Sequence, residues 1–353
     1  MKRLLALALA LALLLVGCAG PGPKVPPTAE TRTSGGDPTL HVADLGRCAL
    51  ASGEVVEGCR LGYRTFGSLD ASRSNAVLFP TYFTGTSGDL VPVVVDQLVD
   101  TKRFFLVIVD ALGDGVSSSP SNSAAQPRMR FPRFTVRDMV EAERRLVTEV
   151  LHLPRLHAVA GISMGGMQAF EWGASHPELV GKVVSIAGTP RLTSSDMLLW
   201  SAEIAGIDGA AAYRGGDYEG RPFLAAPVYV HELHLFTPGH RATETPPEGF
   251  AAFRDAMAKE TWFDWNDWKR QAEAMLAHDV GRGRGGLAGV AKRLPPTLAV
   301  VAEHDQMVNP APSLELAKLA NAETLVLHGP CGHAAPTCEA EAVRAATKAF
   351  LAR

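Results

Sequence analysis

The sequence predicts an α/β protein in which one mostly parallel sheet carries helices on both faces and a helical lid is inserted in the second half. Short apolar runs of strand length alternate with helical patterns along most of the 353 residues. A glycine-flanked serine, Ser163, ends one of these apolar runs and opens a helix. The strand signal stops near residue 190 and resumes near residue 296. With 46% hydrophobic residues, the chain can bury a large core.

The N-terminus predicts an export signal over residues 1–18. Lys2 and Arg3 precede an unbroken apolar run, residues 4–16, which is too short to cross a bilayer comfortably. The run ends in Leu-Val-Gly-Cys, which resembles the bacterial lipoprotein signal, in which the cysteine, here Cys18, is lipidated. The alternative is a plain secretory signal with an incidental cysteine. We therefore expect a membrane-anchored lipoprotein, periplasmic or at the cell surface, with a disordered tether over residues 19–38.

The remaining cysteines are even in number, as expected for disulfides in an oxidising compartment. Sequence proximity favours the pairs Cys48–Cys59 and Cys331–Cys338, and the alternative is two pairs of free thiols. No C-x-x-C or H-x-x-x-H spacing occurs, so we expect no metal site. The net charge of −3 offers no basic field, so we expect no nucleic-acid partner.

The predicted α/β domain spans residues 39–353 and begins with a hairpin. Apolar residues alternate on both sides of Ser52-Gly53-Glu54, a short turn. Thr135 and Asp138 have the spacing of a helix-capping box. The expected elements are a hairpin over residues 40–66, strands over 75–79 and 104–109, helices over 90–98 and from 135, and an irregular loop over 110–133.

The central motif is Gly-Ile-Ser-Met-Gly-Gly, residues 161–166. It follows an apolar strand, residues 156–160, and leads into a helix. Such a turn lifts the Ser163 hydroxyl above the sheet edge, and the helix N-terminus favours negative charge there. Ser163 is therefore the predicted nucleophile, and the alternative is a tight structural turn.

The second half predicts another strand over residues 182–187 and then the helical lid, at about residues 190–294. The lid segment is rich in aromatic residues that look exposed, although ordinary core packing is the alternative for most of them. These are Trp200, Tyr213, Tyr229, Phe236, Trp262, Trp265 and Trp268.

The last two strands carry the candidate partners of the serine. Strands are expected over residues 296–302 and 324–327, with helices over 311–319 and 339–351. In an α/β-hydrolase sheet, nucleophile, acid and histidine follow one another in that order, each in a loop after a strand. Ser163, Asp305 and His333 satisfy that order, and Glu303 is the alternative acid.

Several stretches resemble the homoserine O-acetyltransferase family of α/β-hydrolase folds, from about Tyr63 to Ala352. The strongest is Ser-Met-Gly-Gly-Met-Gln-Ala-Phe-Glu-Trp, residues 163–172. Others lie at residues 75–78, 83–85, 111–113, 131–140 and 263–266. The resemblance implies the same triad, an oxyanion hole made of the backbone N–H groups of Phe83 and Met164, and an acyl-serine intermediate. Members of this family transfer acetyl from acetyl-CoA to homoserine.

Two departures argue against homoserine as substrate. The family carries an aspartate after the catalytic histidine, where this chain has Ala334, and a lid arginine, for which residues 223–229 offer no counterpart. An amino acid's charges would be poorly matched without them. We therefore expect a hydrolase of small esters that needs no cofactor. The alternatives are an O-acyltransferase, for which acetyl-CoA would be the donor, and an inactive binding lipoprotein.

Overall fold

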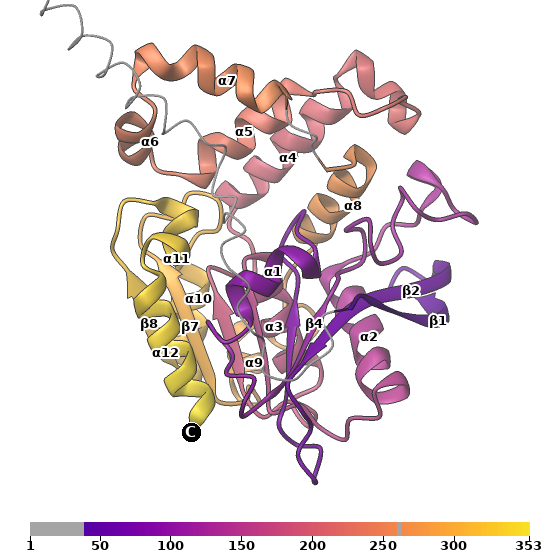
Figure 1. The fold of residues 1–353 in the computed structure, drawn as a ribbon, viewed down its shortest axis with the longest axis vertical. Helices are drawn as coiled ribbons and strands as arrows, with labels where there is room; N and C mark the ends of the chain where they lie inside the picture. Colours follow the sequence, from indigo (N-terminus) through magenta and orange to yellow (C-terminus); the bar gives the residue numbers. More distant parts are fainter. Residues whose placement is uncertain (1–38, 260–262) are drawn as a thin grey trace, which may run out of the picture.

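The computed structural model describes residues 39–259 and 263–353 (Figure 1). The predicted signal peptide, Cys18, the tether over residues 19–38 and Trp262 lie outside the described residues. Within those two ranges, no helix combines the length and the apolar character that a membrane span requires.

The core of the fold is an eight-stranded sheet with the order β1-β2-β4-β3-β5-β6-β7-β8. Only the β1–β2 and β2–β4 pairs are antiparallel, and the other five pairs are parallel. The prediction of a mostly parallel sheet is therefore confirmed. The strands are β1 His41–Ala49, β2 Val55–Phe66, β3 Ala76–Pro80, β4 Phe105–Val109, β5 Ala158–Ile162, β6 Val183–Ile186, β7 Thr297–Ala302 and β8 Glu323–Leu327.

The central strands read as continuous apolar runs because both faces of the sheet are covered. Alternate residues of one strand enter two different cores: Leu78 packs in one cluster, whereas Val77 and Phe79 pack in the other. The first cluster includes residues of α2 Val136–Arg145, α3 Met164–Ser175 and α10 Ala311–Ala320. The second includes residues of α1 Ser87–Val94 and α12 Ala340–Ala352. These helices form the outer layers.

One helix differs in extent from the sequence expectation, and a second begins where it was expected. The first was expected over residues 90–98 but is α1, which begins earlier because Thr86 and Asp89 form a capping box. The capping box of Thr135 and Asp138 is present as expected, and α2 ends in one π-helical turn, Leu146–Val150.

The lid helices lie beyond the end of the sheet where the parallel strands terminate (Figure 1). They are α4 Ser194–Asp208, α5 Ala225–Leu235, α6 Pro238–Glu244, α7 Phe250–Lys259 and α8 Trp265–Leu276. The last helix before β7, α9 Gly286–Ala291, packs against α10 beside the sheet instead. Most of the aromatic side chains noted in the sequence are packing residues, since Trp200, Tyr213, Trp265 and Trp268 are buried; Tyr229 is exposed.

Candidate active site

Ser163 occupies the turn between β5 and α3. Its backbone has φ 55° and ψ −120°, a conformation that a non-glycine residue seldom adopts. Its N–H donates to the backbone oxygen of Ile186 at 2.8 Å, which ties the turn to the neighbouring strand β6. The turn therefore holds the hydroxyl at the sheet edge in a single strained conformation.

The glycines of the motif are required by close backbone contacts. A Cβ on Gly161 would overlap the carbonyl group of Gly165, and one on Gly165 would lie 2.5 Å from the backbone oxygen of Pro80. Strand β3 and the first turn of α3 approach each other closely only because this side chain is missing. This accounts for the Gly-x-Ser-x-Gly pattern in the sequence.

The structure brings Ser163, His333 and Asp305 together from three different loops. The Ser163 hydroxyl lies 2.9 Å from His333 Nε2, and His333 Nδ1 lies 2.7 Å from Asp305 Oδ2. A carboxylate can only accept, so His333 donates from Nδ1 and its Nε2 is free to accept the serine proton. All three side chains are buried. The arrangement suits proton transfer from the serine to a correctly oriented imidazole.

Asp305, not Glu303, is the carboxylate at the histidine. Its second oxygen, Oδ1, accepts the backbone N–H groups of Met307 and Val308, both at 2.9 Å, which fixes its orientation. Glu303 lies outside the site, where it pairs with His328 at 2.7 Å. That hydrogen bond lowers the pKa of Glu303, so the glutamate is an exposed anion.

The backbone N–H groups of Phe83 and Met164 are both available for an oxyanion. Met164 is the first residue of α3, and Phe83 lies in the loop after β3. Among the described residues, neither N–H has a protein acceptor. Free N–H groups beside a nucleophile can stabilise the negative oxygen of a tetrahedral intermediate.

The lid covers Phe83 with aromatic rings. The Phe83 ring lies 5.2 Å from that of Trp200, 5.0 Å from that of Trp268 and 5.8 Å from that of His231, between centroids. His231 also binds Glu203, with Nδ1 3.1 Å from Oε1. Burial alone would lower the pKa of His231, but the charge of Glu203 raises it above its ordinary value. Sequence reasoning missed Glu203 and His231, because a lone pair on two separate helices leaves no spacing signal.

One carboxylate of the lid is already paired with an arginine of the lid. Glu232, the residue that could have received the ammonium group of an amino acid, binds Arg241 at 2.8 Å. Ala334, which follows His333, packs among apolar residues and carries no charge. Positions 232 and 334 therefore offer no unpaired charge for a zwitterion.

An open hollow of about 440 Å³ lies beside the Asp305 loop. Thr237 contributes to it from the lid, and its hydroxyl donates to the backbone oxygen of Pro330 at 2.5 Å. Residues of the lid and of the loops that carry Asp305 and His333 therefore line the hollow together. Its other lining residues are Glu303, His304, Asp305, Gln306 and Pro330.

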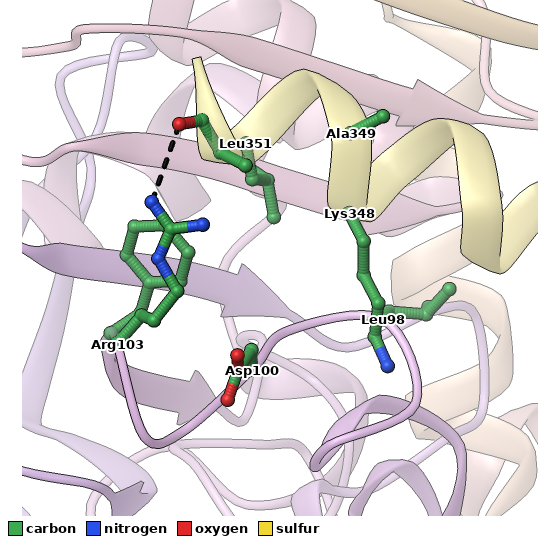
Figure 2. A pocket seen from close by; sticks show the side chains of 8 residues that line it. Leu98, Asp100, Arg103, Lys348, Ala349 and Leu351 are labelled. Atoms are coloured by element: carbon green, nitrogen blue, oxygen red, sulfur yellow. Dashed lines mark hydrogen bonds between the residues drawn. The ribbon is translucent and has the colours of Figure 1, made fainter.

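A second hollow, about 280 Å³, lies between α12 and the segment that precedes β4 (Figure 2). Arg103 there donates to the backbone oxygen of Ala352 at 3.3 Å, and Lys348 donates to that of Asp96 at 2.7 Å. Both cations bind backbone carbonyls. These bonds hold α12 against the segment between α1 and β4, so the hollow is part of the packing of that helix.

Both pairs of cysteines are joined as disulfides. The Cα atoms of Cys48 and Cys59 are 5.7 Å apart and link β1 to β2. The Cα atoms of Cys331 and Cys338 are 6.5 Å apart, and the loop that this disulfide closes contains His333. The second disulfide therefore restricts the loop that holds the histidine. Among the residues that the structure describes, no group of three or more His, Cys, Asp or Glu side chains could hold a metal ion.

Residues 75–336 match a family model described as "alpha/beta hydrolase fold". The homoserine O-acetyltransferase of Thermobifida fusca is 33% identical over 285 residues, which cover 69% of this chain and 75% of that protein. The ethyl acetate hydrolase of Pseudomonas veronii is 30% identical over 286 residues, which cover 76% of this chain and 81% of that protein.

The Corynebacterium glutamicum protein named "Probable esterase Cgl0839" is 32% identical over 189 residues, and the match spans 52% of this chain and only about half, 54%, of that protein. Among solved structures, the acetyl esterase MekB superposes with a TM-score of 0.82 at 26% identity, covering 89% of this chain and 97% of that one.

Proposed function

Because the chain belongs to the alpha/beta hydrolase fold family, we propose that it is a serine-dependent ester hydrolase that acts on small acyl esters through an acyl-Ser163 intermediate. The observation that carries this proposal is the continuous hydrogen-bonded chain Ser163–His333–Asp305, with 2.9 and 2.7 Å between the successive heavy atoms. The backbone N–H groups of Phe83 and Met164, which have no acceptor within the described residues, would serve as the oxyanion hole.

In the acylation step, the Ser163 oxygen attacks the ester carbonyl carbon while His333 Nε2 takes the hydroxyl proton. The carbonyl oxygen becomes an oxyanion, which the N–H groups of Phe83 and Met164 stabilise. Asp305 stabilises the imidazolium that forms. When the tetrahedral intermediate collapses, the bond to the alcohol breaks, and His333 returns its proton to the leaving oxygen.

In the deacylation step, water takes the place of the alcohol. His333 removes a proton from the water, the resulting hydroxide attacks the acyl-serine carbonyl, and the same N–H groups hold the second oxyanion. Collapse releases the carboxylic acid and returns the proton to the Ser163 oxygen. The cycle uses only the side chains described above, together with ester and water.

Three observations support hydrolysis over transfer to an amino acid. Position 334 is an alanine packed among apolar residues, and the segment 223–229 contains no arginine. Glu232 is occupied by Arg241. An ammonium or carboxylate group bound there would lose its hydration without gaining a partner. The names of two relatives, an ethyl acetate hydrolase and an acetyl esterase, favour a short acyl group.

The second candidate function is O-acyl transfer from acetyl-CoA to an alcohol such as homoserine. The identity of 33% over 285 residues to a homoserine O-acetyltransferase favours it. Both functions would use the same acyl-serine, so only the acceptor distinguishes them.

We expect purified protein to release acetate from p-nitrophenyl acetate, and to do so no more slowly when homoserine is titrated in. A site that hydrogen-bonds its substrate can prefer that substrate by about 10⁴-fold. Because this site lacks charged partners for homoserine, we expect it to have lost most of that preference. The measurement is free acetate and O-acetylhomoserine, quantified with p-nitrophenyl acetate or acetyl-CoA as the donor and with Ser163→Ala as the control. Saturable, Ser163-dependent formation of O-acetylhomoserine, faster than acetate release, would establish the transferase instead.

We also propose that Cys18 is lipidated and anchors the enzyme to a membrane, on the strength of the apolar run and the Leu-Val-Gly-Cys sequence that ends it. Cells expressing the full chain and fed an alkyne-labelled fatty acid are expected to label the wild-type protein but not Cys18→Ala. Equal labelling of the two proteins, or none of either, would leave a plain secretory signal as the better description.

A further inference from the structure

The loop that carries Phe83 has a backbone conformation that needs support. The next residue, Thr84, has φ 64°. This left-handed region is unfavourable for a β-branched side chain, and such a residue keeps the conformation only when its surroundings enforce it. The direction of the Phe83 N–H, one peptide earlier, depends on the same turn.

Gln271 of α8 supplies a polar contact to this turn. Its Oε1 accepts the Thr84 N–H at 3.0 Å, and its Nε2 donates to the backbone oxygen of Leu112 at 3.3 Å. The side chain is fully buried. Burying a glutamine costs free energy unless both the oxygen and the nitrogen of its amide are hydrogen-bonded. Here the two hydrogen bonds join the loop after β3 to the loop after β4.

Trp268 lies on the same face of α8 as Gln271, one turn earlier, and contacts the side chain of Phe83. Its ring meets the Phe83 ring edge-on, at 5.0 Å between centroids. Its Nε1 donates to Glu203 Oε2 at 2.9 Å, which fixes the orientation of the indole. Helix α8 therefore contacts the loop at two successive residues, through the side chain of Phe83 and the backbone of Thr84.

We infer that Gln271 is a positioning residue for the oxyanion hole: by holding the Thr84 N–H it aims the neighbouring Phe83 N–H at the oxygen that becomes negative during acylation. The inference rests on the proposed function, because it assigns Gln271 to the same site. It adds that α8, although it belongs to the segment inserted between β6 and β7, is part of the catalytic framework.

The decisive variant is Gln271→Met, which keeps the length of the side chain but removes both polar atoms. We expect kcat/KM for p-nitrophenyl acetate to fall about 10-fold or more, because a misdirected donor stabilises the transition state poorly. The affinity for an alkyl trifluoromethyl ketone, whose adduct with Ser163 carries an oxyanion, should fall by a similar factor. The pH at which activity is half-maximal should not change, because the hydrogen bonds of His333 are untouched.

Gln271→Glu provides the conservative comparison. A carboxyl group retains an oxygen that can accept the Thr84 N–H, so this variant should recover most of both the turnover and the inhibitor affinity that Gln271→Met loses. If Gln271→Met does not fold, Gln271→Asn replaces it, because its amide is one methylene shorter and cannot span the two loops.

Asn266→Leu is the matched control. Asn266 is a buried amide on the same helix, but it bonds to Tyr213 and Gly216, away from the Phe83 loop. The Asn266→Leu substitution should lower Tm and leave kcat/KM within about twofold of the wild-type value, since no oxyanion donor depends on Asn266. The inference is wrong if Gln271→Met loses no more activity than this control, or loses activity with unchanged inhibitor affinity. If wild-type protein hydrolyses no ester, the proposed function fails, and the inhibitor affinities alone still decide the role of Gln271.

Discussion

Ser163→Ala is expected to lower ester turnover by about 10⁴-fold to 10⁶-fold. The substitution removes the oxygen that forms the acyl-enzyme, and within residues 39–259 and 263–353 no other hydroxyl is bonded to His333. Folding should be preserved, because the serine hydroxyl makes no hydrogen bond within the described residues other than the one to His333. The measurements are kcat and kcat/KM for p-nitrophenyl acetate, with Tm as the check on folding.

A fluorophosphonate probe tests the same assignment independently of any substrate. Wild-type protein should carry one adduct, located at Ser163 by mass spectrometry of peptides, and the variant should carry none. Labelling at another residue, or turnover in the alanine variant near the wild-type rate, would show that the nucleophile lies elsewhere.

Asp305→Asn is expected to lower kcat by about 10⁴-fold. An amide can donate a hydrogen bond to His333 Nδ1, which favours the tautomer in which Nε2 carries the proton and cannot accept one from Ser163. The amide also cannot stabilise the imidazolium that forms. The measurement is the pH dependence of kcat, and activity is expected to remain low across the whole range rather than to shift along it.

Glu303→Gln is the matched variant, since Glu303 lies two residues earlier on the same loop and pairs with His328 at the surface. It should leave kcat within about twofold, because an exposed pair contributes little. A loss in Glu303→Gln comparable to that in Asp305→Asn would mean that the carboxylates exchange roles in solution.

The sequence predicts the sheet well because each strand has its own local signal. Short, mostly apolar runs such as Val183–Ile186 are typical of strands covered on both faces, and the capping box at Thr135 marks the start of α2 independently of the rest of the fold. The order of Ser163, Asp305 and His333 needs only the rule that carboxyl ends of parallel strands meet at one edge.

Other features depend on distances that no local pattern encodes. Glu303 and Asp305 follow the same strand, and only the backbone N–H groups of Met307 and Val308 show which carboxylate is held toward His333. Trp265 and Trp268 recur at helical spacing, but that spacing does not show which loops the buried face of α8 packs against. A single glutamine such as Gln271 has no signal of its own, because its partners lie in loops far away in the sequence.

The insertion of the lid between β6 and β7 also affects how the protein folds. Strand β6 ends at Ile186 and β7 begins at Thr297, yet the two are hydrogen-bonded neighbours, so the whole lid must form or be looped out before they pair. The Ser163 turn is hydrogen-bonded to Ile186 of β6, which precedes the lid. During synthesis, a nascent chain can thus carry a shaped nucleophile turn beside an unpaired β6 edge, which is prone to aggregate. His333 follows β8, so the triad cannot be complete before the last strand of the sheet has been synthesised.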